Sequence, residues 1–270
     1  MKKLSVVLTY MFLCLGALLI VFPILFSLAL SFSDNAAILR GEYLPSSLHF
    51  ENYLRAFSTS HLLQYMKNSF LVGVLCTVLQ IVIALLAAYA LVFLPFRGKK
   101  LVFGLFMATM MIPSEVLIIC NFQTIRSWNL LNTYGGLLLP GLASTFGIFL
   151  FRQNMLQIPY ELREAARVAG IGNFRFFRKI VIPMVKNTLV TLAIYFFLVS
   201  WNAYLWPLLS TTNDTVRTVQ IGLRQLKNTE AASDYAMMAA GAMITSIPTL
   251  LFIFFGQKRL QEGMTKAALK

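Results

Sequence analysis

Two parts of this 270-residue chain carry ionisable side chains in a pattern that ordinary loops do not explain. The first is a charged segment, Glu161 to Pro183 (ELREAARVAGIGNFRFFRKIVIP), which lies between two long apolar runs. The second is a single acidic residue, Glu115, which lies inside another apolar run and directly follows Pro113 and Ser114. Each part could catalyse a reaction, bind a solute or bind a partner, and the surrounding sequence decides between these roles.

No catalytic motif accompanies either part. Gly98-Lys99 lacks the upstream glycine and the following hydroxyl of a phosphate-binding loop. The two histidines, His49 and His61, do not form a zinc-protease motif, and no Gly-x-Ser-x-Gly elbow is present. The cysteines lie in apolar runs without metal-ligand spacing; they are Cys14, Cys76 and Cys120. We therefore expect no catalytic residue, metal or cofactor on this chain, so energy for work must come from a partner.

The charged segment predicts a short helix at a surface. Pro159 suits the first helical position, and Glu161 and Glu164 suit the positive end of the helix dipole. Gly170 permits the left-handed conformation that commonly ends a helix. The small and apolar residues between these signals are Ala165, Ala166, Val168 and Ala169. This helix has side chains for close contact with another protein and charged side chains at its rim.

The composition is that of a membrane protein. Hydrophobic residues make up 58% of the chain and charged residues 12%, and the mean hydropathy is +0.73. The net charge of +13 does not indicate nucleic-acid binding, because the cations form short clusters between apolar runs of membrane-spanning length. The first run, after Lys2 and Lys3, could also be a secretory signal peptide. Its apolar core is about twice the usual ~7–15 residues, so we expect a retained spanning helix.

The apolar runs predict an all-α, polytopic membrane protein with six transmembrane helices in a single permease domain over residues 1–270. The expected spans are approximately residues 4–33, 69–94, 101–122, 134–150, 184–206 and 237–255. In this topology 16 of the 23 lysines and arginines lie on the side of the termini and 7 on the other. Cytoplasmic loops are enriched in these residues. We therefore expect a multi-pass protein with both termini and the 152–183 loop in the cytoplasm.

The charged segment also carries a recognisable signature. Glu164-Ala165-Ala166, Gly170 and Ile180-Val181-Ile182-Pro183 match the pattern E-A-A-x(3)-G-x(9)-I-x-L-P, except that Ile182 replaces the leucine. In this respect the chain resembles the permease subunits of ABC importers. Further segments resemble the carbohydrate-uptake branch of that family, which includes maltose and glycerol-3-phosphate permeases; they are Glu51-Asn52-Tyr53, Asn68-Ser69 and Trp201-Asn202-Ala203-Tyr204-Leu205-Trp206-Pro207.

The resemblance implies a set of partners. In this family a permease pairs with a second, homologous permease, two cytoplasmic ATPase subunits that bind ATP and Mg, and an extracytoplasmic solute-binding protein. The membrane would be the cytoplasmic membrane of a bacterial-type cell. The segment at 152–183 would then be a coupling loop that docks on the ATPase. The residues expected to carry this coupling are Arg163, Glu164, Ala165, Ala166, Arg167, Ala169, Gly170 and Pro183.

The function implied is ATP-driven uptake of a sugar or similar polyol by alternating access. An importer of sn-glycerol-3-phosphate or another phosphorylated solute is the alternative. A self-standing channel or an intramembrane enzyme would also be polytopic, but the coupling signature argues against the channel, and the missing catalytic groups argue against the enzyme.

Glu115 is the first candidate for the translocation pathway, because a charged side chain at membrane depth costs about 2.5–3.5 kcal/mol. Pro113 and Ser114 favour a local break of the helix, as in helices that line a cavity. One interpretation is that Glu115 contacts or gates a polar solute, and the other is that it is paired within the helix bundle. Further pathway candidates are Ser114, Trp201 and Asn202, with Asn121 a weaker one, while Trp206 also suits an aromatic belt at the membrane interface.

Overall fold

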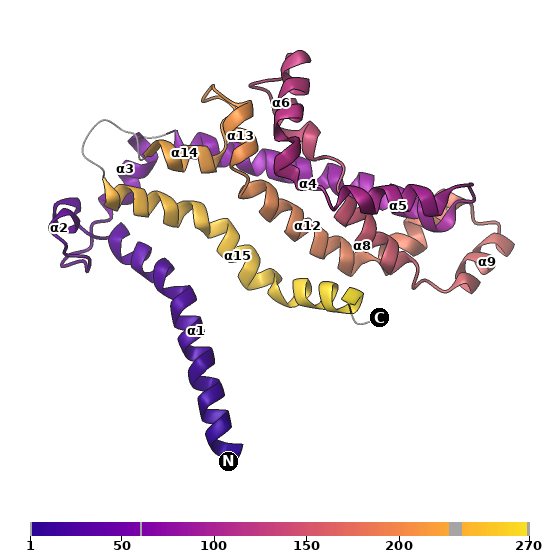
Figure 1. Ribbon diagram of the computed structural model, residues 1–270, viewed down its shortest axis with the longest axis horizontal. Coiled ribbons are helices and arrows are strands. Elements are labelled where there is room, and N and C mark those ends of the chain that lie inside the picture. The colour runs from indigo at the N-terminus through magenta and orange to yellow at the C-terminus, as the bar shows by residue number, and fades with distance from the viewer. Residues whose placement is uncertain (1, 60, 227–233, 269–270) are drawn as a thin grey trace. The chain divides into compact units, whose positions relative to one another are not determined.

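A computed structural model describes residues 2–59, 61–226 and 234–268. Every regular element among these residues is a helix, as the sequence predicts (Figure 1). The chain divides into two compact units, and the long helices α4 (Leu62–Phe93) and α15 (Tyr235–Ala268) each contribute to both.

Unit 1 comprises residues 1–66 and 219–248. It begins with α1, a 30-residue helix over Lys2–Ser31 that contains Pro23. Two short helices follow, α2 (Asn35–Leu39) and α3 (Glu51–Thr59). The unit is completed by the first residues of α4, by α14 (Val219–Leu226) and by α15 as far as Pro248. The region between the first two expected spans, residues 34–68, is therefore largely helical.

Unit 2 comprises residues 67–218 and 249–270 and contains the charged segment and Glu115. Its helices after α4 are α5 (Lys99–Thr109), α6 (Ile118–Ser127), α7 (Tyr134–Leu138), α8 (Thr145–Met155), α9 (Tyr160–Val168), α10 (Asn173–Phe176), α11 (Ile182–Met184), α12 (Lys186–Trp201) and α13 (Leu205–Ser210). Two 3₁₀ turns, η1 (Ser114–Leu117) and η2 (Leu139–Gly141), and one π-helical turn, η3 (Phe177–Val181), join them.

Three helices are long and apolar enough to cross a membrane as single elements. They cover Val6–Ser31, Leu62–Phe93 and Tyr235–Phe254. The span expected at 69–94 thus belongs to a helix that begins seven residues earlier, at Leu62. Three further pairs of helices pass the same test when each bent pair counts as one span. Length and composition therefore allow three to six spans, and the number six stays a prediction.

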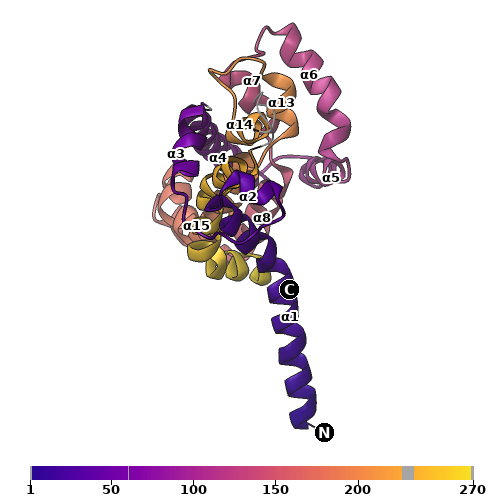
Figure 2. The same cartoon turned by 90° about the vertical axis from the view of Figure 1, so that its left-hand side faces the viewer.

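The three bent pairs occupy the regions of the expected third, fourth and fifth spans. Their members meet at 88° for Lys99–Thr109 and Ser114–Ser127, 50° for Tyr134–Gly141 and Thr145–Met155, and 75° for Asn173–Met184 and Lys186–Trp201. Figure 2 shows the sharp turn between α5 and α6 from the side. The first of these breaks lies at Pro113, where the sequence predicts it.

The main core of unit 2 lies where α4, α8, α12 and the segment around α10 meet. It includes Ala84, Tyr89 and Phe93 of α4, Phe151 of α8 and Phe196 of α12. α8 packs closely against α12 and α4 at Gly147. A Cβ atom added there would lie 2.8 Å from the Cζ atom of Phe196 and 3.1 Å from the Cβ atom of Ala84. A glycine is needed there because the neighbouring helices leave no room for a side chain.

Candidate functional site

The short helix predicted in the charged segment is α9, over Tyr160–Val168. Pro159 lies one position earlier than expected relative to the helix, in the capping position with φ −55° and ψ 135°. At the other end, the amide of Gly170 donates to the carbonyl of Arg167 at 3.0 Å, and the amide of Ile171 donates to the carbonyl of Ala166 at 2.8 Å. This pair of bonds is a Schellman motif. Gly170 has φ +68°, the left-handed conformation that the motif requires.

One side of α9 is attached to the core of its own unit. Ala166 is only 5% exposed and belongs to the same core cluster as Phe176 and Phe177. The guanidinium group of Arg163 lies over the ring of Phe93, 5.5 Å from its centroid. Ala166 therefore packs inside the chain, and its part in coupling to a partner stays a prediction.

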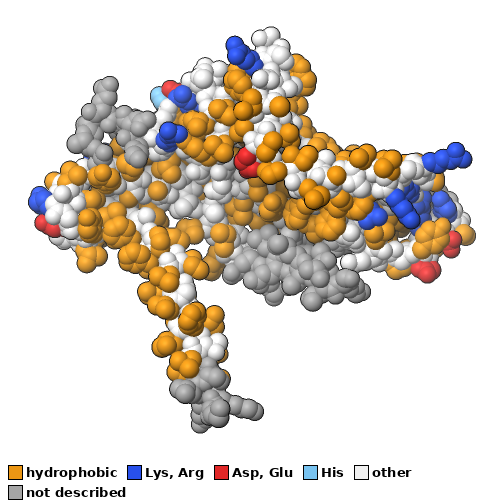
Figure 3. Space-filling model, in the orientation of Figure 1, with side chains coloured by type: hydrophobic (Ala, Val, Ile, Leu, Met, Phe, Trp, Pro, Cys, Tyr) orange, Lys and Arg blue, Asp and Glu red, His pale blue; other side chains and the backbone are white. Residues whose placement is uncertain are grey.

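The other side of α9 is open. Val168 is 90% exposed and Phe174, just after the helix, is 75% exposed. Ala165, Arg167 and Ala169 are also exposed. Within the described parts of the chain, the Glu164 side chain makes no ion pair or hydrogen bond. Figure 3 shows acidic side chains on the surface at α9. Exposed large apolar side chains with polar residues around them are typical of a surface that contacts another molecule.

Aromatic contacts join the segment after α9 to the end of α4. The rings of Tyr89 and Phe177 meet edge-on with centroids 4.9 Å apart, and those of Phe93 and Phe176 with centroids 5.4 Å apart. The hydroxyl of Tyr89 also donates to the carbonyl of Asn173 at 3.1 Å. These contacts attach the segment that follows α9 to α4 through packed side chains. Sequence reasoning did not single out Tyr89 or Phe93, since nothing distinguishes them from other aromatic residues of an apolar run.

A cavity of about 560 Å³ opens in unit 2 between α4, α12 and the broken α5–α6 region. Its lining is mostly apolar, and its polar groups come from Gln80, Ser114, Glu115, Asn121, Ser200, Tyr204 and Trp206. Three of the residues predicted for the pathway, Ser114, Glu115 and Asn121, are thus brought together at this cavity. Ser200, Tyr204 and Trp206 also line it but were not among the predicted site residues. A volume of this size is in the range of small-molecule sites, about 300–1,000 Å³.

The break at Pro113 carries Glu115 to the cavity. Glu115 lies in η1, and its carboxylate accepts a hydrogen bond from the neighbouring Ser114 hydroxyl at 3.1 Å. Within the described parts of the chain, no cation pairs with Glu115. An ion pair within this chain therefore does not explain why a carboxylate lies here. The remaining partners for Glu115 are a solute in the cavity or a residue of another subunit.

Trp201 and Asn202, the other two predicted pathway residues, do not line the cavity. Trp201 is 2% exposed and stacks on Phe197, with ring centroids 5.9 Å apart. The side-chain amide of Asn202 donates to the carbonyl of Leu198 at 2.8 Å, so it pairs with a carbonyl group in the last turn of α12. The structure places Trp201 in the core and Asn202 at the end of α12, and the part of either residue in the pathway stays a prediction. Two residues of the same motif, Tyr204 and Trp206, take the place at the cavity.

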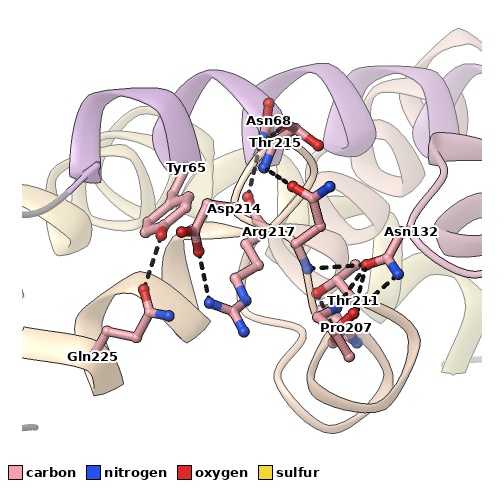
Figure 4. A network of polar contacts seen from close by, with 11 residues as sticks. Tyr65, Asn68, Asn132, Pro207, Thr211, Asp214, Thr215, Arg217 and Gln225 are labelled. Atoms are coloured by element: carbon pink, nitrogen blue, oxygen red, sulfur yellow. Dashed lines mark hydrogen bonds and ion pairs between the residues drawn. The ribbon is translucent and has the colours of Figure 1, made fainter.

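A polar network holds the loop after α13 in place (Figure 4). The buried Asn68 amide donates to the carbonyls of Thr215 and Arg217, both at 2.9 Å, and its side-chain oxygen accepts from the Tyr134 hydroxyl at 2.9 Å. The Asn132 side-chain oxygen accepts from the amides of Thr212 and Asn213 at 2.6 and 3.0 Å. Nearby, the indole of Trp206 donates to the carbonyl of Gly136 at 3.1 Å, which fixes this ring at the cavity.

Comparison with known proteins agrees with this architecture. Residues 80–266 match the family model described as "Binding-protein-dependent transport system inner membrane component". A relative from Rhizobium meliloti (strain 1021), named "sn-glycerol-3-phosphate transport system permease protein UgpE", is 33% identical and covers 98% of both chains. The UgpE protein of Yersinia pestis bv. Antiqua (strain Antiqua) is 33% identical over 94% of both chains. A solved bacterial ABC transporter "involved in the import of the acidic polysaccharide alginate" contains a chain with a TM-score of 0.88 and 22% identity, with 95% of this chain and 96% of that chain covered.

The fold and the family match together define a membrane-embedded transport subunit. The chain belongs to the inner membrane components of binding-protein-dependent transport systems, the permease subunits of ABC importers. It is therefore not an enzyme itself, and the interpretations as a self-standing channel or an intramembrane enzyme are excluded. Membership also means that it works together with other transporter components.

Proposed function

We propose that this chain is one half of a heterodimeric pore that imports a sugar or similar polyol, with α9 as its coupling helix. A second, homologous permease would complete the pore, two cytoplasmic ATPase subunits would supply ATP hydrolysis with Mg, and an extracytoplasmic binding protein would deliver the solute. The chain would cross the cytoplasmic membrane of a bacterial-type cell six times as a single permease domain, with both termini in the cytoplasm. The excess of lysine and arginine on the side of the termini supports this orientation.

The observation that carries the proposal is the two-sided character of α9. Its outer side presents Val168 and the unpaired Glu164, while its inner side is fixed to the core through Ala166. A helix seated in a groove of an ATPase needs an open face for binding and a fixed face for transmitting movement. Pro183, in α11, lies between η3 and α12 and would take part by shaping the connection to α12.

The mechanism would be alternating access. Closure of the ATPase pair around ATP would move α9, and the aromatic contacts of Phe176 and Phe177 would carry this movement to α4. The charged segment also continues through a 75° bend into α12. Residues of α12 line the cavity, so this helix is a second connection between the charged segment and the cavity. The cavity would then open to the binding protein in one state and to the cytoplasm in the other.

For the solute, the cavity favours a small hydroxylated molecule. Amide, hydroxyl and indole groups line it beside one carboxylate, and Trp206 offers an aromatic ring for stacking. Import of sn-glycerol-3-phosphate remains the second candidate, because the relatives at 32–33% identity carry that name. Uptake of labelled sugars and of labelled sn-glycerol-3-phosphate by cells with and without this chain separates the two.

Co-purification tests the assembly. The proposal expects the chain to copurify with a nucleotide-hydrolysing subunit and a second permease, and Glu164→Lys to abolish transport without loss of the folded chain. Normal solute-stimulated ATP hydrolysis in a complex that carries Glu164→Lys would contradict the coupling role.

A further inference from the structure

Several exposed apolar side chains gather at the end of α1, in the segment that runs into α3. They are Tyr43, Leu44, Leu48, Phe50 and Leu54, and we call them the α1-end patch. Leu44 is 82% exposed and Leu54 is 72% exposed. A group of apolar side chains this exposed is uncommon on a surface that faces only water. Neither the coupling helix nor the cavity uses this patch.

The patch is rigidly attached to α1. The buried Asn52 amide donates to the carbonyl of Ser31 at 3.1 Å and to that of Ser33 at 2.9 Å. The hydroxyls of Ser31 and Tyr53 lie 2.8 Å apart in a hydrogen bond. The ring of Phe32 lies edge-on to that of Phe50, with centroids 5.2 Å apart. These bonds satisfy carbonyl groups at the end of α1 and fix α3 to it.

The position of α1 places that end at a membrane boundary. Val6–Ser31 is apolar enough to cross a membrane, and none of its most apolar stretch is buried inside the chain. Figure 3 shows hydrophobic side chains along this helix. At a rise of ~1.5 Å per residue its 26 residues exceed a ~30 Å hydrocarbon core. The apolar surface of the span continues into the patch, because the Tyr43 ring contacts the Phe26 ring of α1 with centroids 5.8 Å apart.

α3 has the amphipathic character of a helix that lies in a membrane surface. At ~100° per residue, the exposed Phe50, Leu54 and Phe57 occupy one sector. Glu51 and Arg55 occupy the next sector, while Asn52 and Ala56 are buried against the chain. Helices of this kind bury an apolar sector at the boundary between headgroups and acyl chains.

We propose that the α1-end patch inserts into the lipid headgroup boundary and anchors α3 along the membrane surface. The cations beside it are already paired: Arg40 with Glu42 at 3.3 Å and Arg55 with Asp234 at 2.5 Å. Insertion therefore relies on apolar contact, and anionic lipids are not required for it.

The test uses the assembled transporter in nanodiscs, with the chain's own cysteines replaced and a fluorescent, polarity-sensitive label on one new cysteine at a time. Leu44→Cys and Leu54→Cys report on the patch. Glu51→Cys is the matched control, on the neighbouring polar sector of the same helix. The labels at 44 and 54 should show blue-shifted emission and stronger quenching by nitroxide lipids labelled near the headgroup than by lipids labelled at the acyl-chain end. The label at 51 should show neither effect.

The same result is expected in phosphatidylcholine alone and with added phosphatidylglycerol. If the labels at 44 and 54 are as exposed to water as the label at 51, the proposal is wrong. It is equally wrong if these labels are shielded but not quenched by lipid, since a partner protein would then cover the patch. A dependence on phosphatidylglycerol would contradict insertion by apolar contact.

Discussion

The ring of Tyr89 meets the ring of Phe177 edge-on, with 4.9 Å between their centroids. Tyr89 belongs to the long helix α4, and Phe177 follows α10 in the segment that carries the coupling signature. Since Phe93 and Phe176 make a similar contact next to this one, the signature is anchored to α4 at two points.

Phe177→Ala should lower the free energy of unfolding by about 3–5 kcal/mol, because a buried aromatic side chain is replaced by a cavity. Phe174→Ala, three residues earlier and 75% exposed, is the matched control and should leave stability nearly unchanged. Thermal unfolding of the purified chain in detergent measures both. Equal losses in the two variants would contradict the anchoring role of Phe177.

Gly170→Val should uncouple ATP hydrolysis from transport. A side chain at φ +68° costs about 1–2 kcal/mol, and a β-branched one distorts the turn that ends α9. Gly170→Asn is the control, since asparagine tolerates this conformation and no atom lies within 4 Å of an added Cβ atom. Solute-stimulated ATP hydrolysis in proteoliposomes should be lost in the first variant and retained in the second; wild-type coupling in Gly170→Val would contradict the prediction.

Gly147→Ala should weaken the packing of α8 by about 1–3 kcal/mol, because the new methyl group would overlap the Phe196 ring. Gly104→Ala in α5 has open space around it and should keep or slightly raise stability. The melting temperatures of the two variants test this prediction. A Gly147→Ala chain as stable as the wild type would mean that α8 and α12 lie farther apart than the structure shows.

Glu115→Gln should raise the solute concentration for half-maximal uptake by about ten-fold, which corresponds to ~1.4 kcal/mol. The estimate follows from the loss of one hydrogen bond to a charged group, worth ~1.5–3 kcal/mol. Glu42→Gln, an exposed residue outside both α9 and the cavity lining, controls for loss of an acidic side chain elsewhere. Uptake kinetics that are unchanged in Glu115→Gln, with normal assembly, would remove Glu115 from the pathway.

Much of the helical architecture follows from the sequence alone. The apolar runs predict helices, Gly170 predicts the end of α9, and Pro113 predicts the break that carries Glu115 to the cavity. These features depend on local chemistry, which periodicity and backbone preference express directly.

The parts that the sequence did not predict depend on contacts between distant residues. Ala166 looks like the other small residues of α9 until the core beneath it is known. Trp201 and Trp206 belong to one motif, yet only Trp206 lines the cavity, because α12 ends at Trp201 and Trp206 belongs to a separate helix, α13. Asn68 is identifiable as part of a family motif, but its role as a hub for the 215–217 carbonyls requires the fold.

Cross-linking from Val168 tests the coupling role of α9 most directly. A photo-reactive amino acid placed at Val168, which is 90% exposed, should cross-link to an ATPase subunit in the assembled transporter. The same amino acid at Leu44, expected on the opposite side of the membrane, should give no such product. Cross-linking of the ATPase from Val168 alone is the result that the account predicts; a Val168 probe that captures no ATPase, while the complex still hydrolyses ATP in response to solute, would contradict it.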